Sequence, residues 1–273
     1  MPFLDLAGDP LWVTDWSEAP RPGGVTFLLL HGAGMDHTVW ALVGRRLAAA
    51  GHGVLAPDLP GHGRSGGAPR GRIEAIAEAV VAMLDRLRPP RPIPVGHSMG
   101  ALVALETAAR WPVAALAPVA AAPRMAVHPD LLALAARDAV RAAELMVTWS
   151  FPRSVRFGAQ PVPGAWLPAA ARRLLAARGP SVLAADLGAC DAYRRAAEVA
   201  SRVRVPALVV AGARDRMTRP AAGRALAEAL PRGRFLCLED CGHMIPLERP
   251  RALAEALLAL AAEASATASS AGR

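Results

Sequence analysis

Residues 93–101 read Ile-Pro-Val-Gly-His-Ser-Met-Gly-Ala, and this stretch decides the fold. Its first four residues form a short apolar run typical of a buried strand, and a helical pattern follows from residue 101. The Gly-x-Ser-x-Gly core lies at the junction, where a sharp turn holds Ser98 in a strained conformation with its hydroxyl exposed. Glycine at positions 96 and 100 lets the turn approach its neighbours closely. The context predicts that Ser98 is a nucleophile; the alternative is an ordinary strand-to-helix turn capped by a serine.

Strand-like and helix-like patterns alternate on both sides of this turn. Such alternation predicts a mostly parallel sheet with helices on both faces, an α/β fold. The predicted strands cover residues 25–30, 54–56, 93–96, 113–120, 205–211 and 235–238. The predicted helices cover residues 38–50, 73–87, 101–110, 221–230 and 251–262.

The alternation stops between residues 122 and 203, where helical stretches are broken by Pro and Gly and no strand pattern occurs. The simplest organisation is an α/β core in two parts, residues 1–121 and 204–273, split by a helical cap over 122–203. Ligands of open α/β sheets bind beyond the carboxyl ends of the strands, so we expect the cap to cover the site. Residues 265–273 are small and polar, which predicts a frayed end.

A serine hydroxyl needs a base that takes its proton and an acid that orients the base. His243 is the predicted base, because it follows the last predicted strand in a Gly-containing loop and no other histidine occurs after residue 128. Asp215 follows the strand over 205–211 through a short turn and is the predicted acid. Asp240 is the main rival and Glu239 a weaker one, but both lie very close to His243 in sequence. The alternatives are a solvated loop histidine and an aspartate that caps the next helix.

Negative charge that develops on a substrate oxygen needs two N–H donors. The backbone N–H of Met99, directly after the nucleophile, is predicted to be one donor. The other is predicted in the loop His31-Gly32-Ala33-Gly34, whose glycines permit an irregular backbone that aims the N–H of Ala33 into the site. His31 is interpreted as a structural support of this loop.

The sequence gives no sign of a cofactor or a metal site. Residues 58–65 read Asp-Leu-Pro-Gly-His-Gly-Arg-Ser, but they lack the ending of a phosphate-binding loop, and the chain contains no Lys. This segment is predicted to be a structural turn at the rim of the core. Cys190, Cys237 and Cys241 lack the paired spacing of zinc ligands, and we expect reduced thiols of a cytoplasmic protein.

The composition limits the kinds of partner that the protein can have. The chain has 273 residues, of which 53% are hydrophobic, so it can bury a large core. Its net charge of +8 comes from scattered Arg residues without any helix-turn-helix or zinc-finger spacing, so we expect no nucleic-acid partner. The first residues do not form a signal peptide, and the apolar run over 25–30 is too short to span a membrane. We expect a small-molecule partner and no membrane.

These motifs together resemble the α/β-hydrolase superfamily, in its lid-bearing serine esterase-like branch. The matching landmarks are residues 31–34, 58–65, 96–100, 212–215 and 242–243. The resemblance implies an eight-stranded, mostly parallel sheet flanked by helices, a variable helical cap, a Ser98–His243–Asp215 triad and no cofactor. Relatives that act on epoxides or haloalkanes carry Asp where this chain has Ser98, so those reactions are disfavoured.

The activity implied by the resemblance is hydrolysis of carboxylic esters with small to medium hydrophobic groups, through an acyl-enzyme. Thioester, lactone and carbon–carbon bond hydrolysis use the same parts. A non-catalytic signal receptor or regulatory partner that retains the triad is the alternative from another class. Several apolar cap residues are candidates either for lining the pocket or for packing the cap onto the core: Met125, Leu131, Leu132, Met146, Trp149, Phe151 and Trp166.

Overall fold

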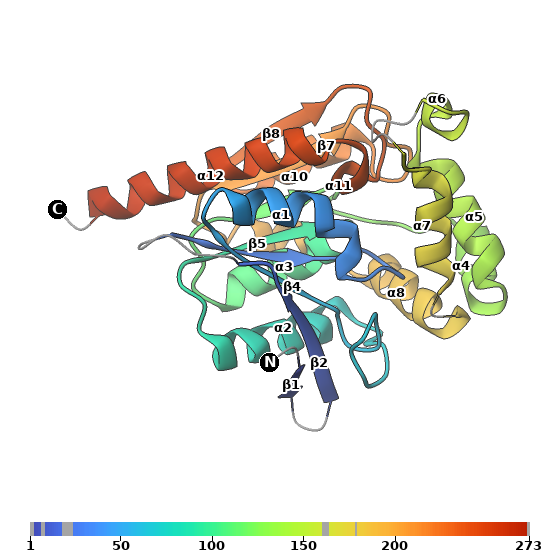
Figure 1. Cartoon of the computed structure of the whole chain (residues 1–273), viewed down its shortest axis with the longest axis horizontal. Helices are drawn as coiled ribbons and strands as arrows, with labels where there is room; N and C mark the ends of the chain where they lie inside the picture. The colour runs from blue at the N-terminus through green and yellow to red at the C-terminus, as the bar shows by residue number, and fades with distance from the viewer. Residues whose placement is uncertain (1–2, 7–8, 18–23, 160–163, 178, 272–273) are drawn as a thin grey trace.

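A single eight-stranded sheet forms the centre of the molecule, with strand order β1-β2-β4-β3-β5-β6-β7-β8 (Figure 1). The computed structural model describes residues 3–6, 9–17, 24–159, 164–177 and 179–271, with side chains up to residue 266. The strands are β1 (Phe3–Leu6), β2 (Asp9–Asp15), β3 (Thr26–Leu30), β4 (Gly53–Pro57), β5 (Pro92–His97), β6 (Ala117–Val119), β7 (Ala207–Gly212) and β8 (Gly233–Leu238). The predicted fold, an eight-stranded and mostly parallel α/β-hydrolase sheet, is confirmed.

The parallel part of the sheet runs from β4 to β8 and contains the buried strands. In β3 and β5 every residue is buried, because helices cover both faces of a parallel sheet. The register places Leu30 of β3 beside Gly96 of β5, and His97 of β5 beside Val119 of β6. The three strands therefore end at one edge, where the loops that follow them meet.

The first two strands were not predicted from the sequence. β1 and β2 pair in antiparallel fashion, and β2 pairs with β4 in the same sense. Only Leu11 and Val13 of β2 are buried, in a pattern that alternates with exposed and half-buried residues. Such a short alternation next to Asp9 and Pro10 carries little strand signal.

Helices cover both faces of the sheet (Figure 1). On one face α1 contacts α12, and on the other α2 contacts α3, while α9 contacts both α3 and α10. This division agrees with right-handed crossovers between parallel strands. The core helices are α1 (Ala41–Ala49), preceded by the 3₁₀ turn η1 (His37–Trp40), α2 (Ile73–Leu87), α3 (Met99–Arg110), α9 (Ala196–Ala200), α10 (Pro220–Ala229), α11 (Ile245–Glu248) and α12 (Pro250–Ala271).

Of the described helices between β6 and β7, all except α9 gather beyond one end of the sheet (Figure 1). They are α4 (Pro129–Arg137), α5 (Ala139–Ser150), α6 (Arg153–Arg156), α7 (Leu167–Ala176) and α8 (Pro180–Ala192). Among them α4 contacts α5 and α8, and α5 contacts α7, so most of these helices pack on one another. We call this group of helices, with the segment 122–128 that leads into it, the cap.

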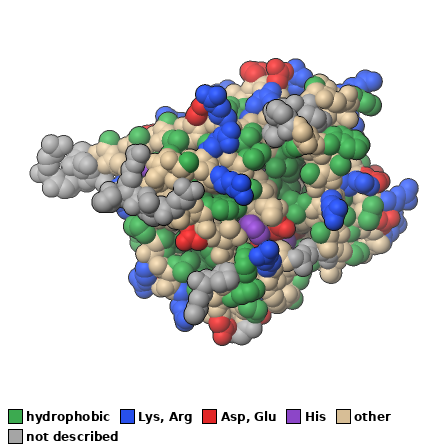
Figure 2. All heavy atoms as spheres, viewed as in Figure 1, with side chains coloured by type: hydrophobic (Ala, Val, Ile, Leu, Met, Phe, Trp, Pro, Cys, Tyr) green, Lys and Arg blue, Asp and Glu red, His purple; other side chains and the backbone are tan. Residues whose placement is uncertain are grey.

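Two element boundaries differ from the predicted ones by four residues or more. β6 covers only Ala117–Val119 instead of residues 113–120, and a single bridge from Leu116 to Ala207 precedes it. α12 continues to Ala271, through most of the segment predicted to be frayed; residues 272–273 lie outside the described residues. No helix in the described part of the chain is long and apolar enough to cross a membrane. Figure 2 shows Arg side chains scattered over one face of the molecule rather than gathered in one patch.

Candidate active site

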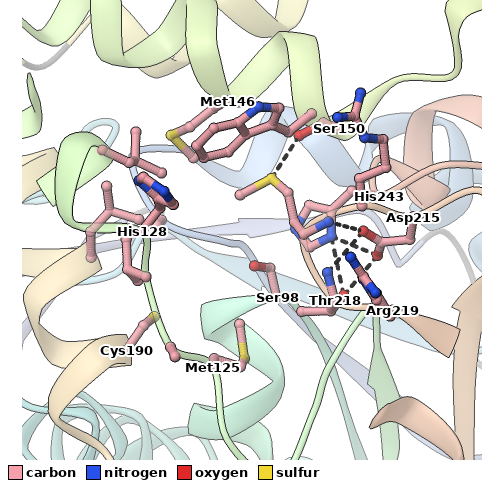
Figure 3. Close-up of a pocket in the computed structure, with 18 of the residues that line it drawn as sticks. Ser98, Met125, His128, Met146, Ser150, Cys190, Asp215, Thr218, Arg219 and His243 are labelled. Atoms are coloured by element: carbon pink, nitrogen blue, oxygen red, sulfur yellow. Dashed lines mark hydrogen bonds and ion pairs between the residues drawn. The ribbon is translucent and has the colours of Figure 1, made fainter. Parts of the chain in front are cut away.

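A cavity of about 770 Å³ lies between the cap and the loops at the strand ends. Ser98, Asp215 and His243 all line it, although they come from three distant parts of the chain (Figure 3). A volume of this size suits a small organic molecule. The structure therefore brings the predicted nucleophile, acid and base to one hollow.

Ser98 occupies the turn between β5 and α3. Its backbone angles are φ 54° and ψ −118°, a region that residues with side chains rarely adopt. The turn is possible because a Cβ at Gly96 would lie only 1.9 Å from the carbonyl oxygen of Gly100, so no larger residue fits there. The Ser98 N–H donates to the Val119 carbonyl at 2.9 Å, which fixes the turn to β6. The strand, strained serine and helix predicted for residues 93–110 are present.

His243 and Asp215 form a buried hydrogen-bonded pair. Nδ1 of His243 lies 2.8 Å from Oδ2 of Asp215 and donates to it, which leaves Nε2 of the ring as the acceptor. The Asp215 carboxylate also accepts from the Thr218 hydroxyl at 2.7 Å and from the N–H groups of Met217 and Thr218 at 2.8 and 2.9 Å. Four donors therefore hold the carboxylate in place.

These contacts set the charge of the pair. Burial would raise the pKa of Asp215, but the His243 charge and the hydrogen bonds from His243 and Thr218 hold that pKa below its usual range. An ionised carboxylate that accepts from Nδ1 stabilises a proton on the opposite nitrogen of the ring. No hydrogen bond joins the Ser98 hydroxyl to His243 among the contacts of the described residues. Such bonds are often formed only when substrate is bound.

The loop that carries His243 is held by its backbone on both sides. The backbone N–H of His243 donates to the carbonyl of Ser150, at the end of α5, over 2.7 Å. The backbone carbonyl of His243 accepts from Nε2 of His97 at 2.9 Å. Burial, with the His243 charge, lowers the pKa of His97 to about 3, so this ring is a neutral donor and not a second base. The cap helix α5, through Ser150, and His97 together position the imidazole.

Glu248 supports the same loop from below. It is only 1% exposed, and its carboxylate accepts from the N–H of Gly242 at 3.1 to 3.2 Å and from the N–H of Met244 at 3.1 Å. Burial raises the pKa of Glu248 to about 7 even though these N–H groups favour the ionised form. Sequence reasoning missed this residue, although its place five residues after His243 could have indicated it.

Met99 lies next to Ser98 and Ala33 lies in the cavity wall, and the role of their N–H groups as oxyanion donors stays a prediction. Met99 is the first residue of α3, where a backbone N–H has no partner within the helix. Ala33 lines the cavity in the loop after β3. His31 donates from Nδ1 to the Gly32 carbonyl at 2.9 Å and accepts the Leu59 N–H on Nε2 at 3.0 Å. Burial, with the charge of His62, lowers the pKa of His31 to about 4, and its predicted structural role is confirmed.

The loop over residues 58–65 is the predicted structural turn. Its buried Asp58 accepts from the N–H of His37 at 2.8 Å, from Nδ1 of His37 at 2.7 Å and from the N–H of Arg64 at 2.8 Å. Asp36, His37 and Asp58 also form the one group of the described residues whose spacing could admit a metal ion. Asp58 already accepts from His37 and Arg64, Asp36 accepts from Thr38, and none of the three residues of this group lines the cavity.

The rival acids lie away from His243. Asp240 and Glu239 are exposed, and Asp240 forms an ion pair with Arg214. The carboxylate that touches the His243 ring is that of Asp215. The geometry therefore favours Asp215 over both rivals.

The cap residues divide between the cavity and the core. Met125, Leu131, Met146 and Trp149 line the cavity, whereas Phe151 is 1% exposed within the core and Trp166 is 64% exposed. Leu132 packs against the core without lining the cavity. The sequence reasoning did not find the remaining cavity residues, which are Met35, Ala126, Val127, His128, Ser150, Leu187, Cys190, Ala213, Arg216, Met217, Thr218, Arg219, Pro220 and Ala221.

Comparison with known proteins agrees with this architecture. Residues 27–256 match a family model described as the alpha/beta hydrolase family. The chain belongs to this family. The resemblance inferred from the motifs is thus confirmed for the alpha/beta hydrolase core.

Relatives of this alpha/beta hydrolase include enzymes that act on esters. It is 36% identical over 222 residues to the pimeloyl-acyl-carrier-protein methyl ester esterase of Chromobacterium violaceum, across 76% of this chain and 83% of that one. A thermophilic esterase from Thermogutta terrifontis has the same fold, with a TM-score of 0.81, 23% identity and 97% of each chain covered. The enol-lactonase from Burkholderia xenovorans LB400 gives a TM-score of 0.82 at 25% identity, over 95% of this chain and 99% of that one.

Proposed function

We propose that this alpha/beta hydrolase cleaves carboxylic esters through an acyl-enzyme intermediate on Ser98. The observation that carries the proposal is the 2.8 Å hydrogen bond between His243 and Asp215 in the cavity that Ser98 also lines. A neutral imidazole whose Nδ1–H is held by a carboxylate presents a basic Nε2 to the hydroxyl of a serine. A strained turn beside that base is the arrangement that activates a serine nucleophile.

In the acylation step, the Ser98 oxygen attacks the ester carbonyl carbon while Nε2 of His243 takes the hydroxyl proton. The carbonyl oxygen becomes an oxyanion, which accepts from the N–H groups of Met99 and Ala33. Asp215 stabilises the resulting imidazolium without becoming protonated. The tetrahedral intermediate then expels the alkoxide, which receives the proton from Nε2 and leaves as the alcohol.

In the deacylation step, a water molecule replaces the alcohol beside His243. Nε2 takes a proton from this water as its oxygen attacks the acyl carbon, and the same two N–H groups bind the second oxyanion. Collapse of the intermediate breaks the bond to the Ser98 oxygen, which takes back the proton from Nε2. The carboxylic acid leaves, and Ser98 and His243 are restored.

The walls of the cavity support hydrophobic substrates of small to medium size. Met125, Leu131, Met146 and Trp149 provide apolar lining from the cap. Apolar surface contributes about 25 cal/mol for each Å² that a substrate buries against it. The methyl ester esterase of Chromobacterium violaceum supports a small alcohol group as the first choice. We therefore expect methyl and other short-alcohol esters of medium-length acyl groups to be substrates.

The test compares the wild type with Ser98→Ala on p-nitrophenyl esters of graded acyl length. The expected result is turnover by the wild type and a loss of about 10⁴-fold or more in kcat for the variant. Mass spectrometry after treatment with a fluorophosphonate should place the adduct on Ser98 alone. Equal rates in the two proteins, or an adduct on another residue, would contradict the proposal.

Lactones form the second candidate class of substrate. The enol-lactonase from Burkholderia xenovorans LB400 shares the fold over 95% of this chain, and a lactone is an internal ester that the same steps open. A panel of γ-lactones, thioesters and methyl esters, ranked by kcat/KM, separates the classes. A γ-lactone preference of more than about tenfold over the matched open ester, worth 1.4 kcal/mol, would replace the first choice.

A further inference from the structure

Asp186 of the cap helix α8 is completely buried, yet the proposed catalytic steps do not use it. Its Oδ2 accepts the backbone N–H of Gly34 at 2.7 Å and lies 2.8 Å from Nε2 of His62. One carboxylate oxygen thus joins three elements: the cap, the loop after β3 that contains Ala33, and the loop after β4. Its other oxygen, Oδ1, is buried without a hydrogen-bond partner among the described residues.

His62 carries a positive charge in this arrangement. Its Nδ1 lies 3.0 Å from the Pro60 carbonyl and its Nε2 faces the Asp186 carboxylate, so both ring nitrogens must donate. Burial alone would lower the pKa of His62, but the hydrogen bond and the charge of Asp186 raise it. His62 and Asp186 therefore form an ion pair that is 1% and 0% exposed at its side chains.

The loop after β3 fits closely against the helix that carries Asp186. Gly34 has φ +68°, and a Cβ at this position would lie 2.9 Å from Cδ1 of Leu183 on α8. The loop backbone thus touches α8 beside the hydrogen bond to Asp186. A positive φ and a close approach both favour glycine here.

The hydrogen bonds fix two successive peptide planes of this loop. The Gly32 carbonyl accepts from Nδ1 of His31 at 2.9 Å and from the N–H of Met35 at 3.2 Å. In a trans peptide the N–H points opposite to the carbonyl, so these contacts hold the plane that contains the Ala33 N–H. The bond from Gly34 to Asp186 holds the next plane, on the other side of the Ala33 Cα. The two planes meet at Ala33, so without Asp186 this residue is anchored on one side only and its N–H is aimed less firmly.

We propose that Asp186, held in place by His62, is a positioning residue that aims the Ala33 N–H at the oxyanion. This inference rests on the proposed function, in which Ala33 is an oxyanion donor. Leu187 and Cys190 of the same helix line the cavity, so α8 contacts the substrate on one side and the oxyanion loop on the other. The cap then contributes to stabilisation of the transition state as well as to substrate choice.

The test uses Asp186→Ala and Asp186→Asn, with Asp191→Ala as a matched control. Asp191 is on the same helix, but its carboxylate accepts the Val127 N–H at 3.0 Å within the cap and does not touch the loop. Three quantities are measured: amide hydrogen exchange of residues 31–35, kcat and KM for p-nitrophenyl butyrate, and the affinity of a trifluoromethyl ketone. The ketone adds to Ser98 and forms an oxyanion, so it reports on the donors directly.

For Asp186→Ala we expect faster exchange of the loop amides and a fall of about 10- to 100-fold in kcat, with KM within about threefold. The affinity for the ketone should fall by a similar factor. Asp186→Asn retains an oxygen that can accept from Gly34, so a smaller loss of about 3- to 10-fold is expected. Asp191→Ala should leave the loop exchange unchanged.

The results that would overturn the role of Asp186 can be distinguished from a failure of the proposed ester hydrolysis. Wild-type exchange and ketone affinity in both Asp186 variants would overturn the inference, as would a loss confined to KM. If Asp186→Ala does not fold, Asp186→Asn decides, and its equality with the wild type overturns the inference. If the wild type hydrolyses no ester, the proposed function is wrong, and the loop exchange alone decides whether Asp186 holds the loop.

Discussion

Replacing Glu248 by Gln tests whether the buried carboxyl beneath the loop that carries His243 makes the stability of the protein depend on pH. Glu248 accepts the N–H groups of Gly242 and Met244, the two neighbours of His243, and it is 1% exposed. Glutamine has nearly the same shape and one oxygen that can accept, but it does not titrate. The substitution therefore removes the charge while it retains most of the packing.

The magnitude follows from the pKa. Burial raises the pKa of Glu248 from 4.5 to about 7 in the folded state. The folded protein thus binds this proton more tightly than the unfolded chain, so the associated stability is greatest in acid and is lost as the pH rises towards 7. Between pH 5 and pH 8 the loss amounts to about 2.5 kcal/mol of unfolding free energy.

Urea unfolding of the wild type and Glu248→Gln at pH 5, 6, 7 and 8 measures this difference. We expect the wild type to lose about 2.5 kcal/mol more than the variant over this interval, since all other titrating groups are shared. Glu255→Gln is the control, because Glu255 is exposed on α12, where it forms an ion pair with Arg251. If wild type and Glu248→Gln show parallel pH dependence, Glu248 is ionised throughout and the reasoning is refuted.

Three further predictions concern the site itself. Asp215→Asn should lower kcat by about 10⁴-fold because the His243 ring loses the charge that orients it, whereas Asp240→Asn should change kcat less than about twofold. Ester hydrolysis kinetics of the two variants measure this difference. A larger loss in Asp240→Asn than in Asp215→Asn would assign the acid to Asp240. Arg216 and Arg219 line the cavity without an ion pair among the described residues, so their charges can attract a negatively charged substrate. Changing both to Gln should lower kcat/KM for hemiesters of dicarboxylic acids by about tenfold relative to neutral esters at low salt. An equal effect on both classes of ester would contradict this electrostatic role. Gly96→Ala should destabilise the fold by about 4 kcal/mol or more, because the new Cβ would lie 1.9 Å from a backbone oxygen. Thermal unfolding measures this loss of stability. An unchanged Tm would mean that the turn relaxes freely and would contradict the prediction.

The features that the sequence predicted correctly are those whose signal is local. The turn at Ser98 follows from glycines within two residues on either side, and its flanking strand and helix have strong periodicity. His243 and Asp215 each follow a buried strand of the parallel sheet. Because parallel strands end at a common edge, positions far apart in sequence could be expected to meet there.

The features that the sequence did not predict depend on partners far along the chain. Asp186 acquires its role from Gly34, 152 residues away, and from His62, 124 residues away. Helical periodicity in the cap shows which face is apolar, but it does not distinguish a face that packs on the core from one that lines a cavity. Phe151 and Met146 were therefore indistinguishable candidates, although only Met146 reaches the cavity.

The position of the cap between β6 and β7 has a consequence for how such a protein can change. The two strands are paired neighbours, so the sheet keeps its register whatever length of chain connects Val119 to Ala207. Doubling the length of a flexible connection costs only about 0.6 kcal/mol of closure entropy. Specificity can therefore diversify by exchange or extension of one insertion while Ser98, Asp215 and His243 stay in place. An exchanged insertion would have to retain two contacts with the core, a carboxylate that meets the backbone at Gly34 and a carbonyl that accepts the His243 N–H.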